Sequence, residues 1–131
     1  MQVELVSPER ITFSGEAAKV IVRTVGGGDL EFLAGHVPFI GVLQISAARV
    51  IGDEGQEIFA IHQGFVQMAN NKVTILSDVS ERKEDIDVPR AEKAKAASQT
   101  AHDANPEDAQ AAAALRRANV RLDVASGVFD G

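Results

Sequence analysis

The chain has 131 residues, of which 45% are hydrophobic and 24% charged, and it carries a net charge of -6 and no cysteine. This balance is typical of a soluble globular protein, and the apolar runs are too short to cross a bilayer. The lack of cysteine excludes disulfides and thiolate chemistry, while the acidic charge argues against nucleic acid as a partner.

The first half of the chain, to about residue 78, is predicted to be all-β. Short β-branched runs alternate with turn residues, and the period of two is clearest in residues 19–23 and 72–76. Many short strands without helices between them favour a β-sandwich or flattened barrel. The predicted strands are residues 3–6, 10–14, 19–24, 29–32, 42–46, 48–51, 57–62, 65–68 and 73–76.

Turn residues separate these strands. Residues 52–55 (GDEG) and the pair Asn70-Asn71 are predicted to be hairpin loops, because Gly and Asn tolerate the positive φ of tight connections. The glycines at 26–28 are interpreted as a turn. They are not interpreted as a phosphate loop, since neither a helix nor a Gly-Lys-Ser/Thr sequence follows them.

After residue 79 the sequence is rich in alanine and charge, and it predicts an antiparallel α-helical hairpin. Asp87 is the expected N-cap of a helix that ends near residue 100 or 101. After a short connection at residues 102–104, Asn105 is expected to cap a second helix that ends before Ser126-Gly127. The domains are therefore expected to be residues 1–84 and 85–131.

The two helices carry matching stripes of small residues, which predict the seam between them. Burying an Ala methyl contributes about 0.8 kcal/mol, against roughly 1.5 to 3 kcal/mol for a Leu-sized side chain. We expect a weakly packed hairpin, poised between docked and extended states. The stripes are Asp87, Ala91, Ala94, Ser98 and Ala101 in the first helix, and Ala111, Leu115, Ala118, Leu122 and Ala125 in the second.

No catalytic or metal site is expected. The histidines at 36, 62 and 102 lie in no ligand-like spacing, and His36 is interpreted as a turn or interface residue. A cupin-like or jelly-roll enzyme would need a His/Glu cluster or a nucleophile with its base. A stand-alone β-sandwich that binds small ligands or another protein remains the alternative.

Two blocks of sequence carry a family resemblance: residues 28–41 (GDLEFLAGHVPFIG) and 64–78 (GFVQMANNKVTILSD). They are similar to the epsilon subunits of F-type ATP synthases, and the order of the blocks and the change from sandwich to hairpin agree over the whole chain. Glu31 and Ala34 depart from the pattern, where the family often has Gly and Pro.

The resemblance implies a non-catalytic central-stalk rotor subunit of a proton-translocating synthase. Its sandwich would bind the gamma subunit, and its hairpin, when extended toward the catalytic alpha and beta subunits, would inhibit ATP hydrolysis. The resemblance implies a location at the cytoplasmic face of a bacterial membrane. A mitochondrial delta chain shares the architecture, but no leader is evident. The residues expected at the c-ring and gamma interface are Gly27, Gly28, Asp29, Leu30 and His36.

A third block, residues 86–91 (IDVPRA), resembles the I/L-D-x-x-R-A motif of epsilon subunits that bind ATP. The resemblance implies ATP as a regulatory ligand and no required cofactor. Ala97 stands where those proteins place an arginine. A helix cap at Asp87 and a solvated arginine face are the simpler interpretations. The implied nucleotide-binding residues are Glu81, Asp87, Arg90, Arg117 and Arg121.

Overall fold

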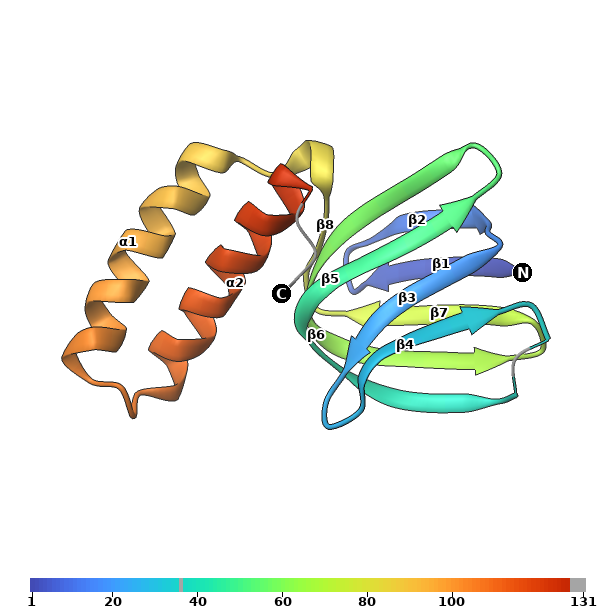
Figure 1. The fold of residues 1–131 in the computed structure, drawn as a ribbon, viewed down its shortest axis with the longest axis horizontal. Helices are drawn as coiled ribbons and strands as arrows, with labels where there is room; N and C mark the ends of the chain where they lie inside the picture. Colours follow the sequence, from blue (N-terminus) through green and yellow to red (C-terminus); the bar gives the residue numbers. More distant parts are fainter. Residues whose placement is uncertain (36, 128–131) are drawn as a thin grey trace.

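The computed structural model describes residues 1–35 and 37–127, which form a β-sandwich with a helical hairpin packed on one end of it (Figure 1). The strands are β1 (Gln2–Ser7), β2 (Arg10–Glu16), β3 (Lys19–Thr24), β4 (Gly28–Leu33), β5 (Phe39–Gly52), β6 (Gly55–Ala69), β7 (Lys72–Ser77) and β8 (Ser80–Arg82). A 3-10 turn, η1 (Lys83–Asp85), leads to the helices α1 (Val88–Ala104) and α2 (Ala109–Ser126).

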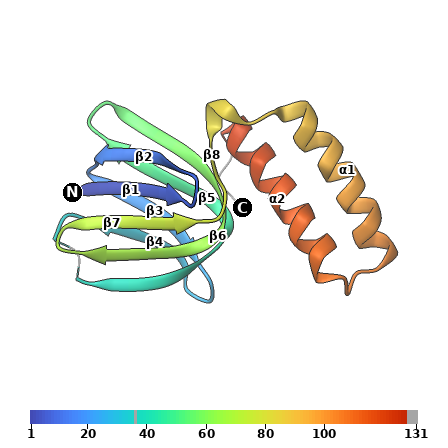
Figure 2. The same ribbon diagram turned by 180° about the vertical axis from the view of Figure 1, so that it is seen from behind.

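The strands form one continuous sheet in the order β2-β1-β7-β6-β5-β3-β4, and β8 pairs with the first half of β6. The pair β1 and β7 is parallel, whereas the other pairs are antiparallel. The long strands β5 and β6 curve through both layers, so the sheet folds over on itself (Figures 1 and 2). The predicted sandwich with a C-terminal hairpin is confirmed.

The core of the sandwich follows from the alternation read in the sequence. In β3, Val20 and Val22 are buried while their neighbours are half-exposed, and in β7 Val73 and Ile75 are fully buried. These side chains meet β-branched and aromatic residues of the facing layer in one cluster. Because each buried Val- or Ile-sized side chain contributes roughly 1.5 to 3 kcal/mol, this cluster is the main stabilising core of the chain.

Two pairs of predicted strands are each one strand in the structure. Residues 42–46 and 48–51 both belong to β5, and residues 57–62 and 65–68 both belong to β6. The prediction placed a break in β6 at Gln63 and Gly64, whose φ values are 69° and 147°. These residues bend the strand without ending it. A Cβ at Gly64 would collide with the carbonyl oxygen of Leu76.

The predicted hairpin turns are confirmed, and one strand was missed. Asn70 and Asn71 have φ of 53° and 59°, and Gly52 pairs with Gly55 across a two-residue loop. The tight connection between β3 and β4 includes Gly26 and Gly27, and Gly28 begins β4. The sequence analysis did not predict β8, because three residues are too short to show a period.

The first helix begins as predicted and the second does not. The Asp87 carboxylate accepts a hydrogen bond from the Arg90 backbone N–H at 3.1 Å, which caps α1. The predicted restart at Asn105 is wrong: its backbone N–H donates to the Ala101 carbonyl and so closes α1. Asp108 caps α2 instead, because its carboxylate accepts from two backbone N–H groups, those of Gln110 and Ala111.

The predicted seam between the helices is only part of the packing of the hairpin. Of the predicted stripe, Ala91, Ala111 and Ala118 are buried, whereas Leu115 and Leu122 are half-buried. The helix α2 also packs on β5 and β6, with α1 on its far side (Figures 1 and 2). This second interface contains Ile45, Ile58, Ala60, Ile86, Val120 and Val124, and it holds the hairpin in the docked position.

Candidate functional site

A cleft of about 570 Å³ lies where the hairpin meets the sandwich. It is lined by the β1–β2 turn, by the chain from Asp78 to Glu81, and by the first turns of α1. Four of the five predicted nucleotide-binding residues line it: Glu81, Asp87, Arg90 and Arg121. The fifth, Arg117, is half-buried on α2 and is not among the residues that line this cleft.

Arg90 is an accessible cation of this cleft. Its side chain is exposed in the first turn of α1, and it forms no ion pair with the residues of the described ranges. The N-cap at Asp87 fixes the start of the helix and so fixes where Arg90 projects. Ala91, in the same turn, is buried, and Arg90 beside it lines the cleft.

Glu81 is already engaged by two partners. Arg121 Nε donates to Glu81 Oε1 at 2.6 Å, and His62 Nε2 donates to the same oxygen at 2.8 Å. The hydrogen bond from His62 and, after it, the one from Arg121 lower the pKa of Glu81 to about 2, against the opposing effect of burial. The three side chains join β6, β8 and α2, and we call them the Glu81 triad.

His62 is the member of the Glu81 triad that the sequence analysis missed. A single histidine in a β-strand gives no spacing signal, and only the pairing of β8 on β6 brings it opposite Glu81. Its side chain is 3% exposed. Its Nδ1 is buried without a hydrogen-bond partner among the described residues, which is consistent with the proton residing on Nε2.

The charges around the cleft are mostly negative. Arg121 is neutralised by Glu81, which leaves Arg10 and Arg90 as the cations facing the remaining acids, Glu9, Asp78, Asp85 and Asp87. The cleft therefore offers acceptors for amines and hydroxyls more readily than donors for phosphates. Over residues 1–35 and 37–127, no group of three or more His, Asp or Glu side chains is arranged to hold a metal ion.

Four of the five predicted c-ring and gamma residues fall at one hairpin. Gly27 lies in the β3–β4 connection, and Gly28, Asp29 and Leu30 are the first three residues of β4. The Asp29 carboxylate pairs with Arg23 Nε at 2.8 Å, which lowers the pKa of Asp29. The glycines and Asp29 are exposed, so the tip is accessible to a partner. His36, the fifth predicted residue, lies outside the described residues.

An exposed apolar row crosses the sheet, and the sequence analysis did not predict it. Val42, Phe65 and Leu76 stand opposite one another on β5, β6 and β7, and Val25 adjoins Val42 through a backbone hydrogen bond. The four side chains are between 47% and 61% exposed. They line a groove of about 710 Å³, which we call the apolar groove. Rows of this kind mark contact surfaces.

The fold and these surfaces define a class of protein: a β-sandwich with an accessory helical hairpin and clefts at their junction. Residues 1–83 match the family described as ATP synthase, Delta/Epsilon chain, beta-sandwich domain. Residues 84–126 match the description ATP synthase, Delta/Epsilon chain, long alpha-helix domain. The chain belongs to the ATP synthase delta/epsilon chain family.

The curated relatives are epsilon chains. The ATP synthase epsilon chain of Streptomyces coelicolor is 38% identical over 128 residues, covering 97% of this chain and 96% of that protein. That of Shouchella clausii is 38% identical over 126 residues, covering 95% and 94%. A solved structure, the Euglena gracilis mitochondrial ATP synthase with OSCP, F1 and c-ring in rotational state 1, contains a chain with the same fold. Its TM-score is 0.79 at 24% identity, covering 95% of this chain and 79% of that one.

These relatives confirm the expected family and the expectation that the chain is a non-catalytic subunit. They argue against the two alternatives considered for the sequence, a cupin-like enzyme and a stand-alone β-sandwich. Within the described residues, no helix is long and apolar enough to span a membrane.

Proposed function

We propose that this chain is a central-stalk rotor subunit that joins the gamma subunit to the c-ring. Support comes from the assemblies named for its structural relatives: the Euglena complex includes F1 and the c-ring, and a Tetrahymena thermophila structure is described as central stalk and c-ring. The Tetrahymena chain has a TM-score of 0.52 at 14% identity, covering 65% of this chain and 68% of that one. In this role the chain is peripheral to the cytoplasmic face of a bacterial membrane, in a proton-translocating synthase.

The apolar groove is the observation that carries this proposal. Four half-exposed hydrophobic side chains in register across three strands and the adjoining turn would be unfavourable in a free subunit, and a partner such as gamma would cover them. The exposed β3–β4 tip, with Gly27, Gly28, Asp29 and Leu30, is a separate protrusion suited to the c-ring. We assign gamma to the groove and the c-ring to the tip.

Co-purification tests this assignment. Phe65→Glu places a charge in the apolar groove and should abolish recovery of gamma with the tagged chain. Ile11→Glu, at a β2 residue that is 62% exposed outside the groove, is the matched control and should leave recovery unchanged. Full recovery with Phe65→Glu would contradict the assignment.

We infer that the hairpin regulates ATP hydrolysis by leaving the sandwich and extending toward the alpha and beta subunits. Two features support release: the seam between the helices is built of alanine, and the apolar interface to the sandwich is small. We place the division between a binding domain (1–84) and a regulatory domain (85–131) at η1, just after β8 ends at Arg82.

We also propose that ATP is a regulatory ligand of the cleft at the Glu81 triad. Arg90 would meet the phosphates, and Asp87 and Glu81 are acceptors for the adenine amine or the ribose. Arg117 would join only by rearranging, and the surplus of acids and the absence of an arginine at Ala97 predict weak binding. ATP that binds only the docked hairpin would favour the docked state by mass action.

Titration of the subunit with ATP tests this proposal. Saturable binding should be lost or weakened about tenfold or more in Arg90→Ala. Lys93→Ala removes a positive charge from an exposed α1 residue that does not line the cleft and serves as the control. Equal affinity for wild type and Arg90→Ala would refute the assignment of the site.

A further inference from the structure

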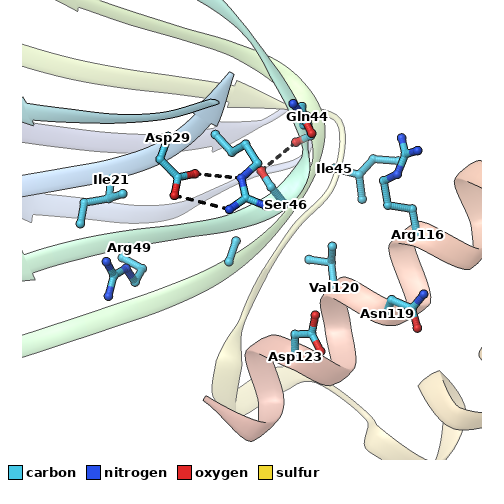
Figure 3. A pocket seen from close by; sticks show the side chains of 12 residues that line it. Ile21, Asp29, Gln44, Ile45, Ser46, Arg49, Arg116, Asn119, Val120 and Asp123 are labelled. Atoms are coloured by element: carbon cyan, nitrogen blue, oxygen red, sulfur yellow. Dashed lines mark hydrogen bonds and ion pairs between the residues drawn. The ribbon is translucent and has the colours of Figure 1, made fainter. Parts of the chain in front are cut away.

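A second pocket, of about 260 Å³, lies between a different face of α2 and the strands β3, β4 and β5 (Figure 3). It shares no lining residue with the cleft at the Glu81 triad. It shares Gln44, Ile45 and Arg116 with the apolar groove, and neither the family resemblance nor the proposals above assign a small ligand to it. We call it the bulge pocket.

The bulge pocket arises from an irregularity in the sheet. Ile21 of β3 pairs with Arg49 of β5, and Thr24 pairs with Leu43. The two pairs are therefore three residues apart along β3 but six residues apart along β5. The extra β5 residues leave the ladder and open a recess in the outer surface of the sandwich. Gln44 Nε2 donates to the Thr24 carbonyl at 2.9 Å and so replaces a lost ladder hydrogen bond.

The recess has an apolar floor. Ile45 is 4% exposed, Val120 of α2 is 8% exposed, and Ile21 and Ala47 are half-buried beside them. Figure 3 shows Val120 and Asp123 projecting from α2 toward the strands. The floor can therefore accept a small ring or short hydrocarbon group, because hydrophobic contact there removes apolar surface from water.

The rim of the pocket is charged, with more arginine than acid. The charged residues that line it are Arg23, Arg49, Arg116, Asp29 and Asp123. Asp29 already pairs with Arg23, and Arg49 adds to the field that lowers the pKa of Asp29. Arg116 is exposed on α2 and makes no ion pair within the described part of the chain. Arg116 thus places a positive charge, without an ion-pair partner among the described residues, at the mouth of an apolar recess.

We propose that the bulge pocket binds a small organic anion, with its apolar ring or chain on the Ile45–Val120 floor and its carboxylate or phosphate on Arg116. The volume lies just below the roughly 300 Å³ at which pockets for drug-sized ligands begin, so the ligand is small. Guanidinium groups bind both anions through charge-assisted hydrogen bonds.

The ligand would bridge the two parts of the chain, because Arg116 and Val120 belong to the hairpin and Ile45 belongs to the sandwich. The ligand would bind only when the hairpin is docked, and its binding would therefore stabilise the docked state by mass action. This coupling does not depend on ATP binding at Arg90.

Methyl-detected NMR titration of the full chain tests the proposal, with benzoate and phenyl phosphate as the anionic probes. We expect saturable shifts of the Ile21, Ile45 and Val120 methyl signals, at about millimolar concentration for ligands of this size. Benzamide, which keeps the ring without the charge, should bind about tenfold more weakly or less. The two anions show whether carboxylate or phosphate is preferred.

Three variants locate the site. Arg116→Ala should weaken benzoate binding several-fold, while Arg117→Ala, the next residue on α2, and Arg90→Ala should leave it unchanged. Arg116 is exposed, so its loss should not unfold the chain, and the amide spectrum verifies this. The proposal is overturned by unsaturable shifts, by equal binding of benzamide, by tighter binding of the cation benzylammonium, or by equal losses in Arg116→Ala and Arg117→Ala.

Discussion

Arg121 of α2 donates its Nε hydrogen to Glu81 Oε1 of β8 over 2.6 Å, which makes this ion pair a direct polar link from the hairpin to the sandwich. His62 fixes the same oxygen from β6. Glu81 is therefore held in place from the sandwich side whether or not the hairpin is docked. The pair is partly buried, so screening by salt is reduced but not removed.

Loss of this link should loosen the hairpin. Arg121→Ala is expected to weaken docking by about 1 to 3 kcal/mol, because it leaves a partly buried carboxylate with one partner instead of two. Hydrogen exchange of α2 amides should accelerate by the factor to which this loss of docking free energy corresponds, about tenfold for each 1.4 kcal/mol. Exchange in β3 and β7 should stay unchanged. Arg117→Ala is the matched control. Equal protection of α2 in Arg121→Ala and wild type would show that the link does not hold the hairpin.

The Glu81 triad also predicts a pH dependence. The pKa of Glu81 is lowered from 4.5 to about 2 by His62 and Arg121. Because the pKa of Glu81 is lower in the folded than in the unfolded state, its ionised carboxylate stabilises the fold, and this stabilisation is fully present above pH 4.5. The stabilisation is lost as the pH falls from 4.5 toward 2 and the carboxylate is protonated. Thermal unfolding of wild type and Glu81→Gln should therefore converge as pH falls through this window. A difference in stability that is constant from pH 6 to pH 2.5 would contradict the assignment of the shift to Glu81.

Much of the fold was predictable because local sequence patterns indicate where its strands, turns and helices begin and end. Alternation marks β3 and β7, paired Asn residues mark the β6–β7 turn, and Asp87 marks the start of α1. The start of α2 was not predictable in the same way, because Asn105 and Asp108 are both acceptable caps. The structure uses Asp108, which satisfies two backbone N–H groups.

The candidate sites were less predictable because they depend on which faces meet. The four-residue spacing of Arg117 and Arg121 puts both on one helix face, but the cleft reaches only Arg121. Val120 and Val124 contact the sandwich, a contact that the small-residue stripe does not reveal. The bulge pocket requires the register shift between β3 and β5, which follows from long-range pairing and has no local sequence signal.

The apolar contact between hairpin and sandwich gives a separate prediction. Val124 is fully buried beside Ile45 and Ile58, so Val124→Ala should cost about 1.5 kcal/mol or more of docking free energy. In an assembled synthase, this release should increase inhibition of ATP hydrolysis if the extended hairpin is the inhibitory state. Val88→Ala, at a residue that is 37% exposed on α1, is the control. Unchanged hydrolysis together with a demonstrably released hairpin would contradict the regulatory proposal.

The bend in β6 should be the least tolerant glycine position of the sandwich. Gly64 has φ of 147°, and an added Cβ would collide with the Leu76 carbonyl oxygen, so Gly64→Ala must distort the β6–β7 pairing. We expect a loss of about 1 to 3 kcal/mol from backbone strain alone, measured by urea unfolding. Gly52→Ala is the matched control, because its Cβ would meet its nearest backbone atom at 3.7 Å, an ordinary contact. Since Gly64 also borders the apolar groove, recovery of gamma should fall with Gly64→Ala and not with Gly52→Ala. Equal stability of the two variants would show that β6 can straighten without cost.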